Sequence, residues 1–429
     1  MTFLIGSAIL LALIAVGIPI AFALGLAGIA SLLLLVPWTV ISGLMSQVVH
    51  GTAAHYILLT IPMFVLMAEF LGAGGIAQDL MIACNRLMRR VRGGLAMAAV
   101  FTGTVMAAAS GSSSASVASI TRASFPTMRQ LGYDPGFSIG TIAIAGTLAI
   151  MIPPSIAFIV YGLMTELSVG KLFMAGLIPG LLTAAGYMIT IAVVVWRKPE
   201  LAPLASDNLT STSDAPEQSG KVWPILILVV LVLGGLYSGV ATPTEIGALG
   251  AFGALVMSIA MRRLSRAGFQ EAVGNTLRTS ARILTIIFGA KLFGYFISFT
   301  HVTDMMLAWI ADVGLSRYAV LFLLILVYIG LGMIMDQLAI IILTAPIAFG
   351  LLTGLGFDGI WFGVLLVKTA EIGLVTPPMG LNIFIASAAA RTNPRAGFIG
   401  VVPFIIAELI ILGLLIAFPG LVMFLPGLL

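Results

Sequence analysis

The chain has 429 residues, of which 60% are hydrophobic and only 8% are charged, and its mean hydropathy is +1.18. A soluble domain cannot bury that much apolar surface, so the composition predicts a protein that crosses the lipid bilayer several times. The single cysteine, Cys84, excludes an internal disulfide and a metal site built from several cysteines. The formal charge of +4 comes from basic residues confined to particular loops, which indicates membrane topology and not a nucleic-acid partner.

Apolar segments follow one another along most of the chain. The first has no basic region before it, so we expect a retained helix and not a cleaved signal peptide. The one clearly polar stretch, residues 197–221, is rich in Pro, Ser and Thr without apolar periodicity. It predicts a flexible linker between two halves, 1–196 and 222–429. Apolar segments are expected near 3–16, 20–36, 57–83, 95–120, 138–164, 172–196, 222–240, 243–261, 283–300, 318–352, 360–388 and 397–425.

The two halves resemble each other in sequence. LGYDP in the first half is matched by LGFDG in the second, and each half contains one PP pair within an apolar segment. These matches are all separated by the same number of residues, which makes coincidence improbable and predicts an internal duplication. Three pairs of residues keep the same separation of 224: Leu131 and Leu355, Pro153 and Pro377, and Pro19 and Pro243.

The charge pattern predicts that the second repeat is inverted. The loop near 86–92 carries four arginines, whereas its counterpart near 310–316 carries an aspartate and no base. Conversely, the expected loop 262–282 carries five arginines, and its counterpart 38–58 has no Lys or Arg. Because basic loops stay cytoplasmic, equivalent loops would lie on opposite sides. With five crossings per half, both termini are expected to be periplasmic and the linker cytoplasmic.

Two segments, about 95–120 and 318–352, do not fit a single crossing. Each must leave the membrane on the side where it entered, and each is too long for one helix. Their centres are polar: SGSSSAS (Ser110–Ser116) in the first and GMIMDQ (Gly332–Gln337) in the second. We interpret both as re-entrant hairpins whose tips stop at membrane depth, where irregular backbone must be buried in protein or line a wet cavity.

Two other segments, 138–164 and 360–388, each contain a PP pair. Proline lacks a backbone N–H and its ring clashes with the preceding turn, so each helix is expected to break there. A broken helix exposes carbonyls that coordinate a cation and amides that attract an anion. Two such breaks, related by inverted symmetry and each accompanied by a hairpin tip, predict a secondary transporter.

The tips differ in chemistry. The hydroxyls and the glycine of the first tip suit sodium, a hard cation that prefers oxygen ligands, although small residues are also common where membrane helices pack closely. The second tip has Asp336, and an acid at membrane depth costs about 3 kcal/mol and is by default a functional candidate. Its alternative role is a hydrogen bond to nearby backbone that holds the tip.

Further polar residues lie near the predicted breaks. Lys368 and Glu371 are three residues apart on one predicted helix and are expected to pair. Glu69 and Glu245 have no partner that the sequence identifies. Thr376 also lies beside a break, and the candidate substrate ligands are Ser114, Ser155, Asp336 and Asn382.

In this order, these motifs resemble the large membrane subunit of tripartite ATP-independent periplasmic (TRAP) transporters. The resemblance covers essentially the whole chain, and the combination of motifs is specific although no single one is. The motifs are SGSSSASVASI (Ser110–Ile120), IPPSIAFIVYG (Ile152–Gly162), TPTEIGALGA (Thr242–Ala251), GMIMDQLAIIILTAPI (Gly332–Ile347) and TPPMGLNIFI (Thr376–Ile385).

The resemblance implies an elevator-type transporter of the bacterial inner membrane, driven by Na⁺ and not by ATP. It also implies three partners: a small four-helix membrane subunit, a periplasmic binding protein, and an organic acid such as a C4-dicarboxylate or sialic acid. Where family members commonly have glycine this chain has Ala149, which affects how closely a hairpin can approach. By the same resemblance, one sodium ion is bound by Ser112 or Ser113 with Ala149, Ile152 and Pro154, and a second by Gly332, Gly373, Thr376 and Met379.

The sequence fits three rival functions less well. A proton-coupled transporter of the same architecture would use Asp336 or Glu371 as its titrating acid, whereas the oxygen-rich tips favour sodium. A serine hydrolase would need a base near Ser112, but no histidine is expected at membrane depth and no GxSxG or HExxH motif occurs. A channel fits two closed hairpins less well than alternating access does. We therefore expect no enzyme, and the carried carboxylate is left open.

Overall fold

The computed structural model describes residues 2–88, 91–203 and 222–428. Across these ranges the chain forms α-helices and short 3-10 turns, with no strand. Six helices are long and apolar enough to cross a membrane, and a bent pair of helices raises the number to seven if it forms one span. The prediction of an all-α membrane protein is confirmed. The predicted ten crossings and the inversion of the second repeat stay predictions.

The first half ends in a 29-residue helix, α10, whose last residue is Arg197. The first residue of the predicted linker is therefore helical, and residues 204–221 lie outside the described part of the chain. The elements of this half are α1 (Thr2–Ala15), α2 (Ile20–Leu32), α3 (Trp38–Ala53), η1 (Tyr56–Leu59), α4 (Thr60–Ala73), α5 (Ile76–Met88), α6 (Gly94–Ser110), α7 (Ser113–Gln130), α8 (Pro135–Met151), α9 (Ile156–Thr165), α10 (Val169–Arg197) and η2 (Pro199–Leu201).

The second half repeats the order of a packed helix pair followed by a broken helix. In the first half these are α6–α7 and α8–α9, and in the second they are α15–α16 and α17–α18. Its elements are α11 (Trp223–Ser238), α12 (Pro243–Ala260), α13 (Arg266–Thr300), α14 (Val302–Val313), α15 (Arg317–Gly332), α16 (Gln337–Gly354), α17 (Gly359–Val375), α18 (Leu381–Ala390), α19 (Pro394–Ala417), α20 (Gly420–Met423) and η4 (Pro426–Leu428).

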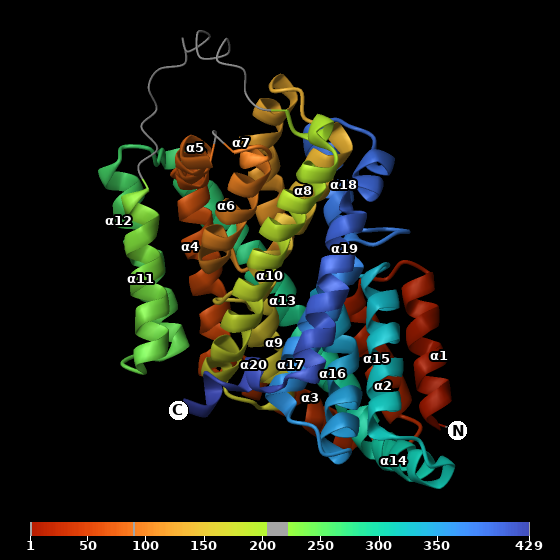
Figure 1. Ribbon diagram of the computed structural model, residues 1–429. Coiled ribbons are helices and arrows are strands. Elements are labelled where there is room, and N and C mark those ends of the chain that lie inside the picture. The colour runs from red at the N-terminus through yellow and green to blue at the C-terminus, as the bar shows by residue number, and fades with distance from the viewer. Residues whose placement is uncertain (1, 89–90, 204–221, 429) are drawn as a thin grey trace.

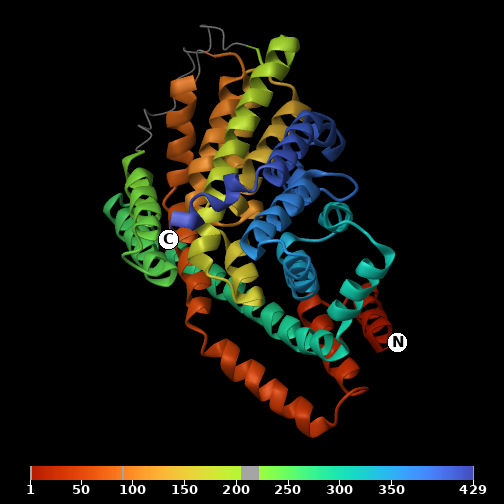
Figure 2. The ribbon, with the colours of Figure 1, turned by 60° about the horizontal axis from the view of Figure 1, so that its bottom comes forward.

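Two expected loops are helical. Residues 38–53 form α3, which lies apart from the main body in Figure 2. The expected basic loop 262–282 is short, because Ser265 accepts the amide of Gly268 at 3.0 Å and starts the 35-residue helix α13. Both loop predictions were wrong because a search for apolar runs misses helices that carry polar residues. Arg278 and Arg282 consequently lie on a helix.

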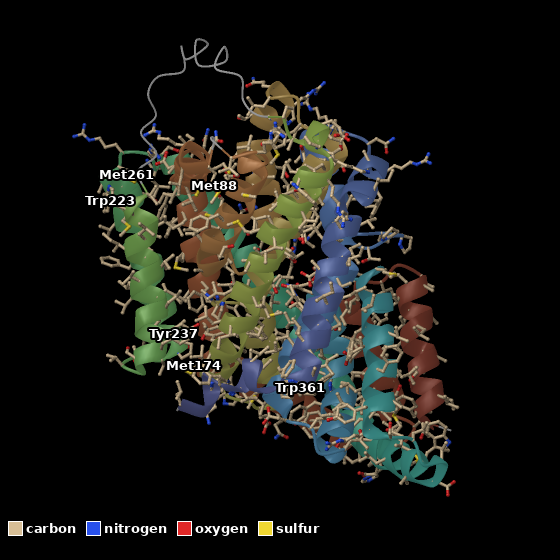
Figure 3. The ribbon with its side chains drawn as sticks, viewed as in Figure 1. Met88, Met174, Trp223, Tyr237, Met261 and Trp361 are labelled. Atoms are coloured by element: carbon tan, nitrogen blue, oxygen red, sulfur yellow. The ribbon has the colours of Figure 1, made fainter. Side chains whose placement is uncertain are left out.

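The helices pack in two groups. One contains α2, α4, α12 and α13, and the other contains α6 to α8 with α15 to α19. Helices α8, α10 and α19 run side by side in Figure 1. The C-terminal end of α10 and the start of α11 lie at one end of the molecule, together with Met261 and Met88 in Figure 3, whereas Trp361 and both chain ends lie toward the other.

Candidate functional site

Both predicted helix breaks are present at the PP pairs. Helix α8 ends at Met151, directly before Ile152 and the first pair, and α9 continues at an angle of 41°. Helix α17 ends at Val375, and α18 starts after Gly380, whose φ of +49° favours glycine. Both Pro–Pro peptide bonds are cis. The prolines thus end both helices, as the sequence predicted; the first pair is buried, whereas Pro377 and Pro378 are exposed.

The first hairpin tip lies directly against the first break. Gly111 joins α6 to α7 with a φ of +57°, and a Cβ on this residue would stand 2.9 Å from the carbonyl oxygen of Pro154. Ser112 is the N-cap of α7 and makes no capping bond with its side chain. The fold therefore brings the serines predicted for the first sodium ion next to the break that contains Ala149, Ile152 and Pro154.

The second tip meets the second break in a similar way. A Cβ on Gly332 would stand 2.9 Å from the Cα of Gly373, so the two backbones touch. The amide of Met379 donates to the carbonyl of Met333 at 3.2 Å. Thr376 Oγ1 donates to the carbonyl of Ile372 at 2.5 Å and keeps its lone pairs available. All four residues predicted for the second sodium ion lie at this contact.

One side-chain contact connects the two halves at this place. Asn382, at the start of α18, donates from Nδ2 to Ser113 Oγ at 2.6 Å and to the carbonyl of Ala143 at 3.4 Å. Asn382 is fully buried, and its Oδ1 has no hydrogen-bond partner among the described residues. Ser155 is also fully buried, and its hydroxyl accepts the amide of Phe158 at 3.4 Å.

A cavity of about 330 Å³ lies between the two tips and the helices α4 and α13. Three of its lining residues are the predicted Ser112, Ser113 and Ser114, and Asp336 contributes from the second tip. Asp336 Oδ2 also accepts the amide of Leu338 at 3.1 Å, which is the backbone role that the sequence allowed as an alternative. The remaining predicted substrate ligands, Ser155 and Asn382, do not line the cavity.

The other group of helices contributes two charged residues that the sequence did not assign to the site. Arg282 lines the cavity from α13, and no described carboxylate lies within ion-pair distance of it. Glu69 lines the cavity from α4 and accepts Nδ2 of Asn275 at 3.2 Å. Arg282 was assigned to a loop, so no signal from the sequence placed it here.

A buried charged cluster lies behind the breaks. The predicted pair is confirmed, with Lys368 Nζ 3.0 Å from Glu371 Oε2. Lys368 also lies 2.6 Å from Glu408 Oε2 and donates to Thr183 Oγ1 at 2.8 Å, and Tyr187 donates to Glu408 Oε1. Glu408 was missed, although a lone acid within the apolar segment 397–425 is a signal that could have found it.

The remaining acid without a predicted partner has a local role. Glu245 forms a capping box with Thr242 at the start of α12: its carboxylate accepts the Thr242 amide at 2.7 Å, and the Thr242 hydroxyl accepts the Glu245 amide. This arrangement satisfies backbone groups at the helix start, so it explains Glu245 without any ligand.

Known proteins resemble this chain in sequence over most of its length. Residues 7–421 match the family model described as "Tripartite ATP-independent periplasmic transporter, DctM component". The chain is 35% identical over 405 residues to a Pseudomonas aeruginosa C4-dicarboxylate TRAP transporter large permease protein, covering 94% of this chain and 93% of that one. It is 32% identical to an Escherichia coli 2,3-diketo-L-gulonate TRAP transporter large permease protein, covering 95% of each.

Two solved membrane transporters share the fold. The Alcanivorax borkumensis YdaH transporter has a TM-score of 0.67 at 14% identity and covers 88% of this chain and 89% of its own. Neisseria gonorrhoeae MtrF has a TM-score of 0.61 at 15% identity and covers 87% and 83%. The relatives are named as transporter permeases, so the prediction that the chain is not an enzyme is confirmed. The chain belongs to the DctM family, the large permease component of tripartite ATP-independent periplasmic transporters.

Proposed function

We propose that this chain imports an organic acid with sodium ions, by an elevator movement of the hairpins and broken helices against the other group of helices. The observation that carries the proposal is the cavity of about 330 Å³, where both hairpin tips face α4 and α13. Its volume falls at the lower end of the range of roughly 300–1,000 Å³ that is usual for small-molecule sites. Each tip also contacts a helix break, and backbone carbonyls at such breaks can coordinate a cation.

The proposed sodium sites use oxygen ligands from these contacts. In the first, Ser112 or Ser113 joins the carbonyls of Ala149, Ile152 and Pro154; in the second, Gly332, Gly373, Thr376 and Met379 take part. Both sets fit a hard monovalent cation, because hydroxyl and carbonyl oxygens are its preferred ligands. The bonds of Ser113 and Asn382 support this arrangement, since they hold the first tip against the second broken helix.

The proposed substrate site combines Arg282 with the first hairpin tip. Arg282 has no described acidic partner, and its planar guanidinium can bind a carboxylate with two parallel hydrogen bonds. The N-terminus of α7, with Ser112 to Ser114, presents hydroxyls and a positive dipole end to the same cavity. The relatives are named for C4-dicarboxylate, isethionate and 2,3-diketo-L-gulonate, all of which are organic anions.

Family membership implies partner subunits, and we propose a small membrane subunit and a periplasmic binding protein. The family and the apolar helices also imply a multi-pass protein of the bacterial inner membrane. We propose that the end carrying the α10–α11 connection is cytoplasmic, because basic residues concentrate there, and that both termini are periplasmic.

Uptake in proteoliposomes tests the proposal. The chain is reconstituted with its small subunit and binding protein, and labelled carboxylates are offered under separate sodium and proton gradients. Uptake should follow the sodium gradient and fall in Ser113→Ala. Uptake driven by protons alone, and lost in Asp336→Asn or Glu371→Gln, would contradict sodium coupling and favour the proton-coupled alternative.

A further inference from the structure

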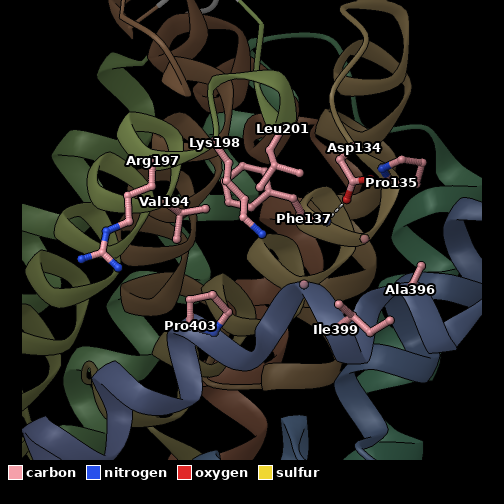
Figure 4. Close-up of a pocket in the computed structure, with 12 residues that line it drawn as sticks. Asp134, Pro135, Phe137, Val194, Arg197, Lys198, Leu201, Ala396, Ile399 and Pro403 are labelled. Carbon is pink, nitrogen blue, oxygen red and sulfur yellow. Dashed lines mark hydrogen bonds between the residues drawn. The ribbon is translucent and has the colours of Figure 1, made fainter.

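A second cavity, of about 410 Å³, lies far from the hairpin tips, at the end of the molecule that carries the α10–α11 connection. The start of α8, the C-terminal end of α10 and the first turns of α19 surround it. The proposed transport of an organic acid does not use this cavity. Figure 4 shows its lining residues, and they divide into two cations above a largely apolar wall.

The two cations are Arg197 and Lys198. In Figure 4 the Lys198 ammonium is directed toward the space between Phe137 and Pro403, whereas the Arg197 guanidinium extends outward, away from the other labelled side chains. Neither has an acidic partner within ion-pair distance among the described residues. Asp134 is the one acid in the lining, and its Oδ1 is engaged by the amide of Phe137 at 2.7 Å. The cavity therefore presents positive charge that no acid among the described residues pairs with.

The wall below these cations is apolar and continues along the outside of the molecule. The cavity is lined by Phe137, Val194, Leu201 and Ile399, and Ile399 is 69% exposed. Large exposed apolar side chains then follow the adjacent α10 and α19, including Ile189, Val193, Val402 and Ile406. A soluble anion needs only the cations, whereas cations beside an apolar cavity wall and exposed apolar side chains match an amphiphile.

Exposed tryptophans near the cavity indicate that it lies at the level of the lipid headgroups. Trp196, one residue before Arg197, is 81% exposed, and Trp223 begins α11 at the same end of the molecule. Exposed tryptophans concentrate at the level of lipid headgroups. The cations thus lie where phosphate groups of one leaflet are found, and basic pockets between membrane helices are known to bind anionic headgroups.

We propose that this cavity binds an anionic phospholipid, whose phosphate pairs with Arg197 and Lys198 and whose acyl chains lie along the exposed apolar side chains of α10 and α19. The cations at the end of α10 also suit the helix dipole. The dipole alone, however, would not require an adjoining cavity next to exposed apolar side chains. A lipid headgroup and free phosphate both present a phosphate group to the cations. The test must therefore compare the lipid with inorganic phosphate.

The test is thermal unfolding of the purified full-length chain in neutral detergent. Dioleoylphosphatidylglycerol, dioleoylphosphatidylcholine and inorganic phosphate are titrated separately, and the rise in Tm gives an apparent Kd for each. The variants are Arg197→Gln, Lys198→Gln, their double variant and Lys198→Arg, which keeps the charge. Lys171→Gln is the matched control, because Lys171 is exposed at the opposite end of the same helix α10.

Phosphatidylglycerol should stabilise the unaltered chain at lower concentration than phosphatidylcholine. Its Kd should rise by about fivefold for each charge removed and stay unchanged in Lys171→Gln and Lys198→Arg. Equal effects of the two lipids, or an equal loss in the Lys171 control, would overturn the proposal. Stabilisation by inorganic phosphate to the same extent would overturn the assignment to a lipid and assign the cavity to a soluble anion.

Discussion

Ser113 and Asn382 are separated by 269 positions in sequence, yet Asn382 Nδ2 donates to Ser113 Oγ at 2.6 Å inside the protein. Ser113 belongs to the first hairpin and Asn382 to the second broken helix. The bond therefore fixes a tip of one half against a break of the other. Both residues are buried, and Asn382 is fully so.

Replacing Asn382 with Ala tests that bond. The variant leaves Ser113 Oγ without its donor, which should lower the free energy of unfolding by about 1–3 kcal/mol. It should also raise the sodium concentration needed for half-maximal uptake, since the first tip loses a positioning contact. Asn393→Ala is the control: Asn393 caps α19 from an exposed position, so stability should fall without a change in sodium dependence. An unchanged sodium dependence in Asn382→Ala would show that the bond is only structural.

Gly332 tests the close approach of the second tip to its break. In Gly332→Ala the new Cβ would stand 2.9 Å from the Cα of Gly373, and backbone at that distance must move. Sodium-dependent uptake should fall strongly. Gly330→Ala, on the same helix and with open space around it, should keep uptake and gain helix stability by up to about 1 kcal/mol. Equal uptake in the two variants would mean that the contact between Gly332 and Gly373 is not needed.

Arg282 tests the proposed carboxylate contact. Arg282→Gln should raise KM for the organic acid by about tenfold to a hundredfold, equivalent to about 1.5–3 kcal/mol. Arg282→Lys should recover only part of the loss, because an ammonium does not form the paired bonds of a guanidinium. Arg266→Gln, at the exposed start of the same helix, is the control. A KM unaffected by Arg282→Gln would remove this residue from the substrate site.

The buried cluster predicts a large effect on stability. Lys368→Met leaves Glu371 and Glu408 facing each other without their cation, and breaking a buried ion pair costs about 3–5 kcal/mol. The unfolding midpoint should fall accordingly, and adding Glu371→Gln with Glu408→Gln should restore part of it. Lys171→Gln should leave the midpoint unchanged. No recovery in the triple variant would indicate that packing around Lys368, and not its charge, sets the stability.

The features that could be predicted from the sequence are those that depend on neighbouring residues in the chain. A proline pair ends a helix wherever it occurs, so both breaks were located to the residue. The pair of Lys368 and Glu371 was also accessible, because a spacing of three residues places two side chains on one face of a helix.

The contacts that the sequence did not predict join residues that are distant in sequence. Glu408 joins Lys368 from another helix, and the bond between Asn382 and Ser113 crosses most of the chain. Arg282 was missed for a different reason. Its polar neighbours suggested a loop, and only the tertiary structure shows that α13 continues past them toward the cavity.

The charged cluster has a mechanical consequence for the two breaks. Lys368 and Glu371 lie on α17, Glu408 on α19 and Tyr187 on α10, and Tyr187 also lies 3.2 Å from Thr147 Oγ1 on α8. Separating α17 from α19 would leave Glu408 without its cation in an apolar interior, which is costly, and Thr147 joins α8 to the same cluster through Tyr187. The helices that carry the first and second breaks, α8 and α17, are thus connected through one cluster, and a displacement of one break is expected to carry the other with it.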